Sequence, residues 1–113
     1  MSHITTHILD LSRGRPAADV GVKLFATDEA SERLVGQART DADGRVADGL
    51  IDDSNYRPGV YRIEFATEEY FRANNEATFY PVVCISFRVA PNEAHYHVPV
   101  LLSAFGYSTY RGS

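Results

Sequence analysis

Short apolar stretches alternate with polar positions along most of the chain, a pattern typical of β-strands. In residues 83–89, apolar side chains occupy every odd position, and Cys84, Ser86 and Arg88 lie between them. A period of two places one face of a strand in a core. Turn sequences such as Asp43-Gly44 separate these stretches. The pattern predicts strands over residues 4–11, 21–27, 34–40, 45–47, 59–66, 80–89, 95–103 and 105–111.

One segment, residues 67–74, interrupts the strands and predicts a short helix. Thr67 is suited to capping the first free amides, and Glu68 and Glu69 fall in the first turn, where the helix dipole favours acidic side chains. Asn74 suits the exit. Strands at this spacing with a single helix predict an all-β domain, a β-sandwich, over residues 1–113.

Composition allows this fold to be stable without cross-links. A chain of 113 residues with 44% hydrophobic content is long enough for one domain with a two-layer core. Neither disulfides nor a structural metal is needed, and the lone Cys84 has no internal partner. Because Cys84 lies in the apolar run 82–85, we expect a buried structural thiol.

The distribution of charge argues against two classes of partner. The net charge is −4, and acidic and basic residues are interspersed. This leaves no basic face for nucleic acid and no polybasic stretch for a membrane surface. The chain also lacks a signal-like start and any run of membrane-spanning length. We therefore expect a soluble, cytoplasmic protein whose partners are small molecules or proteins.

His7 is the first candidate for chemistry. In a strand, His7 and Leu9 point to one face, and Ile8 and Asp10 point to the other. His7 thus stands beside an apolar residue. Taken alone, it is most simply interpreted as a surface histidine.

Two further histidines share one face of the strand predicted near the C-terminus. His95 and His97 lie there with Pro99 and Leu101. With His7 as a third ligand they could hold zinc, if the two strands were adjacent. The sequence has no thiolate cluster and no tight metal-ligand spacing, so we favour metal-free acid–base chemistry, for which imidazole is suited. We therefore expect neither a metal nor another cofactor.

The last six residues carry hydroxyls, a guanidinium and the terminal carboxylate. A frayed tail is the simpler interpretation. Against it, Phe105, Tyr107 and Thr109 alternate with their neighbours almost to the end, which predicts a strand paired to its last residues. Arg45, just after the Asp43-Gly44 turn, is either a solvated surface residue or a clamp for a planar substrate rich in carbonyl groups.

Taken in chain order, these motifs resemble the 5-hydroxyisourate hydrolases, the transthyretin-related enzymes of urate degradation. The resemblance runs from near residue 4 to the end and is carried by five segments. They are His-Ile-Leu-Asp at 7–10, Arg-Gly-Arg-Pro-Ala at 13–17, Asp-Gly-Arg at 43–45, His-Tyr-His-Val-Pro-Val-Leu-Leu-Ser at 95–103 and Tyr-Ser-Thr-Tyr-Arg-Gly-Ser at 107–113. The terminal Tyr-Arg-Gly-Ser separates the enzymes from transthyretin, the hormone carrier. One departure is Ala104, where relatives usually carry proline.

The resemblance implies a transthyretin-like sandwich of two four-stranded sheets, assembled as a homotetramer, a dimer of dimers, around a central channel. It implies hydrolysis of the cyclic amide of 5-hydroxyisourate to 2-oxo-4-hydroxy-4-carboxy-5-ureidoimidazoline, without a metal or organic cofactor. The alternative is a transthyretin-like protein that binds a small ligand without transforming it. Such a carrier needs a roomy apolar passage, which bulky polar side chains would obstruct.

The resemblance also assigns the site residues, all near the channel. The implied catalytic residues are His7, Arg45, His97 and Ser113. The implied substrate-binding residues are Leu9, Tyr110, Arg111 and Gly112. His95 lies nearer the start of its strand and is not among them. Two points stay open: whether His7 or His97 is the general base, and whether Ser113 acts through its hydroxyl or the terminal carboxylate.

Overall fold

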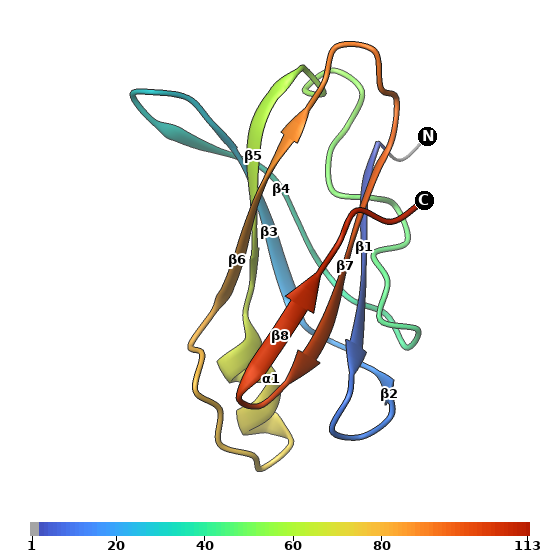
Figure 1. Ribbon diagram of the computed structural model, residues 1–113, viewed down its shortest axis with the longest axis vertical. Coiled ribbons are helices and arrows are strands. Elements are labelled where there is room, and N and C mark those ends of the chain that lie inside the picture. Colours follow the sequence, from blue (N-terminus) through green and yellow to red (C-terminus); the bar gives the residue numbers. More distant parts are fainter. Residues whose placement is uncertain (1–2) are drawn as a thin grey trace.

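The computed structural model describes residues 3–113, whose strands form two sheets of four strands each (Figure 1). The first sheet has the order β2-β1-β7-β8, made of β1 (Ile4–Asp10), β2 (Arg15–Pro16), β7 (Tyr96–Ser103) and β8 (Gly106–Thr109). The second has the order β4-β3-β5-β6, made of β3 (Gly21–Thr27), β4 (Glu32–Arg39), β5 (Gly59–Phe65) and β6 (Val83–Val89). Helix α1 (Thr67–Ala73) follows β5. The predicted sandwich of two four-stranded sheets with one short helix is confirmed.

The core lies between the sheets and fixes which way each strand faces. Ile4 and Ile8 of β1 are at most 1% exposed, as are Leu24 and Ile63 of the second sheet. Burying such a side chain contributes about 1.5–3 kcal/mol, and a one-residue slip would turn every such group outward. The alternate residues of β1, Thr5, His7 and Leu9, are therefore held on the outer face of the first sheet.

Strands β1 and β7, from opposite ends of the chain, lie side by side and run parallel (Figure 1). Their register places Thr5 opposite His97 and His7 opposite Pro99. The other strand pairs are antiparallel. The parallel pair brings both termini to one region, and it places the histidines of both ends on neighbouring strands of one sheet.

The structure corrects the prediction of a strand over residues 45–47. Arg45 forms only an isolated antiparallel bridge with His7. The turn before Arg45 limits the pairing to this single bridge. It is held against β1 by the amide of Ile8, which donates to the carbonyl of Gly44 at 2.9 Å. Gly44 has a φ of +74°, and a Cβ there would collide with the carbonyl oxygen of Ile8, so only glycine permits this approach.

Several strand boundaries also differ from the prediction. The alternation missed β2, a two-residue strand in which Pro16 pairs with Leu9. Strand β6 begins at Val83 rather than residue 80, and β7 begins at Tyr96 rather than residue 95. A two-residue strand is too short to show any period.

The helix is confirmed, but its predicted cap is wrong. Ala66 occupies the N-cap position without a side-chain cap, and the buried Thr67 donates its hydroxyl to the carbonyl of Tyr80 at 3.2 Å. Glu68 and Glu69 lie in the first turn and Asn74 ends the helix, as predicted. Within residues 3–113, no helix is long and apolar enough to cross a membrane.

Cys84 is exposed, so the prediction of a buried thiol is also wrong. Val83 beside it is 1% exposed, and the strand alternation turns Cys84 to the opposite face. There its sulfur accepts a hydrogen bond from Nη1 of Arg62 at 3.3 Å. The period of the strand therefore decides its position, and the apolar neighbours do not.

The end of β1 is anchored by a buried carboxylate. Asp10 is 0% exposed, and its Oδ2 accepts a hydrogen bond of 2.6 Å from the hydroxyl of Tyr70 in α1. The backbone amide of Arg13 donates to Oδ1 at 3.1 Å. Burial first, and then the carboxylate of Asp10, raises the pKa of Tyr70 well above its ordinary range. This contact ties the strand that carries His7 to the helix.

Candidate active site

The outer face of the first sheet carries the predicted histidines. On β1, Thr5, His7 and Leu9 are partly exposed, while the residues between them are buried. On β7, His97 and Leu101 are likewise partly exposed. His7 and His97 thus lie on one face of adjacent strands, as the strand parity predicted.

Arg45 joins this face although it lies in no strand. Its backbone bridges to His7, and its amide donates to Oδ1 of Asp41 at 3.0 Å. The amide of Asp41 in turn donates to the carbonyl of Arg45 at 2.8 Å. These backbone contacts hold the turn against β1. Arg45 is exposed there, and it lies close enough to His97 for its charge to lower the pKa of that histidine.

His97 is the most constrained of the candidate side chains. Its Nδ1 lies 2.8 Å from the hydroxyl of Thr5, across the parallel pair. Burial first, and then the charges of Arg45 and His7, lowers the pKa of His97 below its ordinary value. Its imidazole is therefore neutral at pH 7 and able to act as a base or as an N–H donor.

The C-terminal segment is held against His97, but it is not a strand to its end. Strand β8 stops at Thr109, whose hydroxyl donates to the carbonyl of Pro99 at 2.8 Å. Pairing resumes at Gly112, whose amide donates to the carbonyl of His97 at 2.8 Å. A Cβ on Gly112 would lie 2.6 Å from Cδ2 of His97. The tail therefore packs on the histidine ring, contrary to the frayed-tail interpretation.

Arg111 has contacts of its own outside this face. Its guanidinium carbon lies 4.4 Å from the centroid of the Tyr96 ring, and Nη2 lies 3.5 Å from Oε2 of Glu93. The side chain therefore anchors the tail to the loop before β7. Tyr110 is 59% exposed, and Ser113 at the terminus is exposed as well.

The zinc alternative needed three ligands in one place. The described part of the chain, residues 3–113, contains no group of three His, Cys, Asp or Glu side chains that could hold a metal ion. His95 is exposed just before β7, and it contributes the smallest of the charge effects that lower the pKa of His97.

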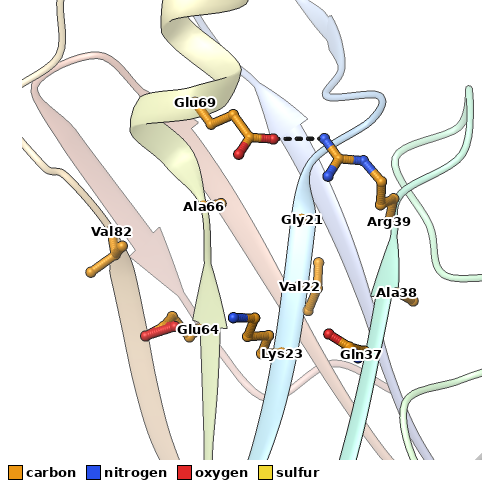
Figure 2. A pocket seen from close by; sticks show the side chains of 10 residues that line it. All are labelled: Gly21, Val22, Lys23, Gln37, Ala38, Arg39, Glu64, Ala66, Glu69 and Val82. Atoms are coloured by element: carbon orange, nitrogen blue, oxygen red, sulfur yellow. Dashed lines mark hydrogen bonds and ion pairs between the residues drawn. The ribbon is translucent and has the colours of Figure 1, made fainter.

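A hollow of about 440 Å³ lies elsewhere, on the second sheet beside α1 (Figure 2). Lys23, Arg39, Glu64 and Glu69 are among its lining residues. Arg39 is already engaged there, because its Nη2 lies 2.8 Å from Oε1 of Glu69. None of the residues predicted for the site lines this hollow.

Comparison with known proteins identifies the family. The profile of the HIUase/Transthyretin family matches residues 4–112. The chain belongs to the HIUase/Transthyretin family. A 5-hydroxyisourate hydrolase of Caulobacter vibrioides is 44% identical, with all of both chains covered. A probable 5-hydroxyisourate hydrolase of Caenorhabditis elegans is 41% identical, over 97% of this chain and 81% of the relative.

Solved structures of both branches resemble this member of the HIUase/Transthyretin family. Transthyretin from Sparus aurata superposes with a TM-score of 0.92 at 31% identity, covering 99% of this chain and 97% of that one. The 5-hydroxyisourate hydrolase of Klebsiella pneumoniae superposes with a TM-score of 0.84 at 32% identity, covering 99% and 100%. The fold therefore does not separate carrier from enzyme, and the side chains must.

Thr5 is a residue of the site that was not predicted from the sequence. Thr5 contributes the hydroxyl that contacts His97. Its position two residues before His7 places both on one face, so parity could have found it. The partner of that hydroxyl depends on the parallel register between β1 and β7, and no local pattern states that register.

The lowered pKa of His97 predicts a pH effect on stability. A histidine in the unfolded chain has a pKa of about 6.5, whereas the pKa of folded His97 is lower, so near this pH the unfolded chain binds a proton more readily. The unfolded state then binds more protons, so the free energy of unfolding falls as the pH drops through that value. Urea unfolding between about pH 7.5 and about pH 5.5 should show a smaller loss of stability for His97→Gln than for wild type. Equal losses would contradict the assignment.

Proposed function

We propose that this protein is a 5-hydroxyisourate hydrolase, which opens the cyclic amide of its substrate to give 2-oxo-4-hydroxy-4-carboxy-5-ureidoimidazoline. One observation carries the proposal: His7, His97 and Arg45 meet on one outer sheet face, with Gly112 packed on the His97 ring. The relative from Caulobacter vibrioides, named as such a hydrolase, is 44% identical over its whole length and supports it. The substrate is thus a small molecule.

A histidine activates the attacking water in this proposal. Water is a poor nucleophile near neutrality, and a neutral imidazole that takes its proton contributes about 10²- to 10⁴-fold. His7 and His97 are the two candidates, and the lowered pKa of His97 keeps its ring neutral. The second histidine then orients the water or assists at the carbonyl.

Arg45 stabilises the negative charge that develops on the carbonyl oxygen. A donor positioned in advance in a site shielded from water can contribute several kcal/mol. The bridge to His7 and the hydrogen bonds to Asp41 hold the Arg45 backbone in place before substrate binds. Leu9, on the face of His7, supplies an apolar contact for the substrate ring.

The C-terminal residues complete the proposed site. Tyr110 and Gly112 bind substrate, and Ser113 contributes its hydroxyl or the terminal carboxylate. Arg111 supports them by fastening the tail to Glu93 and Tyr96. In this role Arg111 positions the neighbouring residues of the tail.

A second candidate function is binding of a small ligand without catalysis. It is favoured by the similarity to sea bream transthyretin, solved in complex with thyroxine, which has a TM-score of 0.90. The side chains favour the enzyme, because His7, His97 and Arg45 make this sheet face polar. A carrier passage is predominantly apolar.

We infer that the chain assembles as a homotetramer, a dimer of dimers, with the site in a channel between subunits. Strands β8 and β6 each lie at the edge of a sheet, and an unpaired edge is a template for another strand. Exposed aromatic residues lie in or just before these two edge strands: Phe105 is 71% exposed, Phe79 is 68% exposed and Tyr107 is 40% exposed. Large exposed apolar groups mark protein interfaces. The cytoplasmic location expected from the sequence stays a prediction.

An ultraviolet assay tests the proposed function. Urate oxidase generates 5-hydroxyisourate in the cuvette, and its decay is followed with and without the protein. The decay rate should rise in proportion to protein concentration, above the spontaneous rate. Decay at the spontaneous rate alone would contradict hydrolase activity, and ligand binding without turnover would favour the second candidate.

The same assay tests the expectation that no metal is used. Wild-type protein treated exhaustively with a chelator should keep its full activity, because imidazole and guanidinium groups suffice for the proposed chemistry. Activity that is lost on chelation and restored by zinc would contradict this expectation.

A further inference from the structure

The strongest unexplained contact near the site joins Thr5 to His97. Thr5 Oγ1 lies 2.8 Å from Nδ1 of His97, and the two residues are paired across the parallel strands β1 and β7. A threonine side chain is stiff at χ1, so its hydroxyl is held at this position by the strand. The contact is partly buried, and Thr5 lies two residues before His7 on the same strand.

The chemistry of the two groups indicates the direction of this hydrogen bond. Within residues 3–113, His97 Nδ1 is the sole hydrogen-bond partner of the Thr5 hydroxyl. If Nδ1 carried the proton, its N–H would donate a hydrogen bond to the Thr5 hydroxyl oxygen. The hydroxyl hydrogen would then have no acceptor among these residues. If Thr5 donates to Nδ1, both groups are satisfied and the ring proton sits on Nε2.

We infer that Thr5 is a positioning residue that donates to Nδ1 of His97 and fixes the imidazole in the tautomer with its proton on Nε2. Nε2 makes no hydrogen bond to residues 3–113, so this N–H is left for the substrate. The backbone bond from Gly112 to the carbonyl of His97 holds the same residue from the other strand edge. This inference rests on the proposed function for its catalytic meaning.

The tautomer divides the roles of the two histidines. His97 donates its Nε2–H to the carbonyl oxygen as negative charge develops there, and it keeps that proton. His7 takes a proton from water as the water oxygen bonds to the carbonyl carbon. When the C–N bond of the cyclic amide breaks, the proton on His7 passes to the leaving nitrogen. The balance is one water added across one C–N bond.

Nitrogen-15 NMR of histidine-labelled protein tests the tautomer directly and without substrate. Wild type should show His97 protonated on Nε2 and unprotonated on Nδ1. In Thr5→Val, the pKa of His97 should rise, because a hydrogen bond that favours the neutral ring is lost. The neighbouring charges of His7, Arg45 and His95 are the same in both proteins. A proton on Nδ1 in wild type, or an unchanged or lower pKa in the variant, would overturn the inference.

Two further variants separate positioning from simple destabilisation. Thr5→Ser keeps the hydroxyl and should keep the wild-type tautomer and pKa. Thr6→Val removes a hydroxyl from the same strand on its buried face, where Thr6 donates to the carbonyl of Val98 at 2.7 Å. It should leave both NMR signatures of His97 unchanged. A pKa change of equal size in Thr6→Val would overturn the positioning role.

Kinetics supply the remaining test. Thr5→Val should lower kcat about tenfold, which corresponds to about 1.4 kcal/mol, with KM little changed, and Thr5→Ser should restore it. A wild-type kcat in Thr5→Val would overturn the inference. If the protein has no hydrolase activity, the proposed function fails, while the NMR result still decides the tautomer.

Discussion

Replacing His97 with alanine is expected to lower kcat/KM by about 10²- to 10⁴-fold, leaving the decay of 5-hydroxyisourate near its spontaneous rate. The loss follows because His97 combines a ring kept neutral by burial with a position beside Arg45 and His7. Without the imidazole, the carbonyl loses a proton-transfer or N–H partner that no neighbour can replace. The ultraviolet assay, run over a range of substrate concentrations, measures kcat and KM separately.

The controls for this variant address fold and position. His97→Ala should keep the wild-type fold and sediment as wild type does, because the core between the sheets does not include His97. His95→Ala removes an exposed imidazole two residues away and should keep near-normal turnover. Arg45→Ala should behave like His97→Ala. Near-normal activity in either His97→Ala or Arg45→Ala would refute the assigned roles.

The facing of the strands was predictable because it depends on local alternation. His7 lies between buried residues of β1, and His97 lies between Tyr96 and Val98, which are both 6% exposed. The period of two can be read from the sequence, and the folded strands keep it because burial stabilises each inward residue. The faces that His7 shares with Leu9, and His97 with Leu101, were therefore predicted correctly. The same rule, applied consistently, would have placed Cys84 outside.

The features that were missed depend on pairing between distant segments. The parallel register that sets Thr5 against His97 joins residues 92 positions apart, and no local pattern specifies it. Arg45 reaches His7 through a glycine turn and a single bridge, which alternation cannot distinguish from a strand. Arg111 has its partners in Glu93, in the loop before β7, and Tyr96, at the start of β7, and both positions follow from the tertiary fold.

The resemblance to a family supplied what alternation could not. Tyr110 and Ser113 are exposed in the single chain. In the proposed site their partners are the substrate or a second subunit. No packing argument within one chain would have selected them. Their roles stay predictions, and the C-terminal variants described next test them.

Removing Gly112 and Ser113 is expected to reduce turnover by about 10²-fold or more while the protein stays folded. Gly112 is the residue through which the tail pairs with β7, since its amide donates to the carbonyl of His97 at 2.8 Å. A displacement of about 1 Å at a catalytic group can cost about 10²-fold in rate. The core is formed by other residues, so thermal unfolding should change little.

A single substitution sharpens this test. In Gly112→Ala, the new Cβ would lie 2.6 Å from Cδ2 of His97, so the ring or the tail must move. We expect a fall in kcat with a small change in stability, since Gly112 is one residue from the terminus. Gly106→Ala is the matched control in β8, because its Cβ would meet only the Ser103 hydroxyl at 3.7 Å. If neither the truncation nor Gly112→Ala lowered kcat, the tail would have no role in catalysis. His7, His97 and Arg45 would then have to account for catalysis without it.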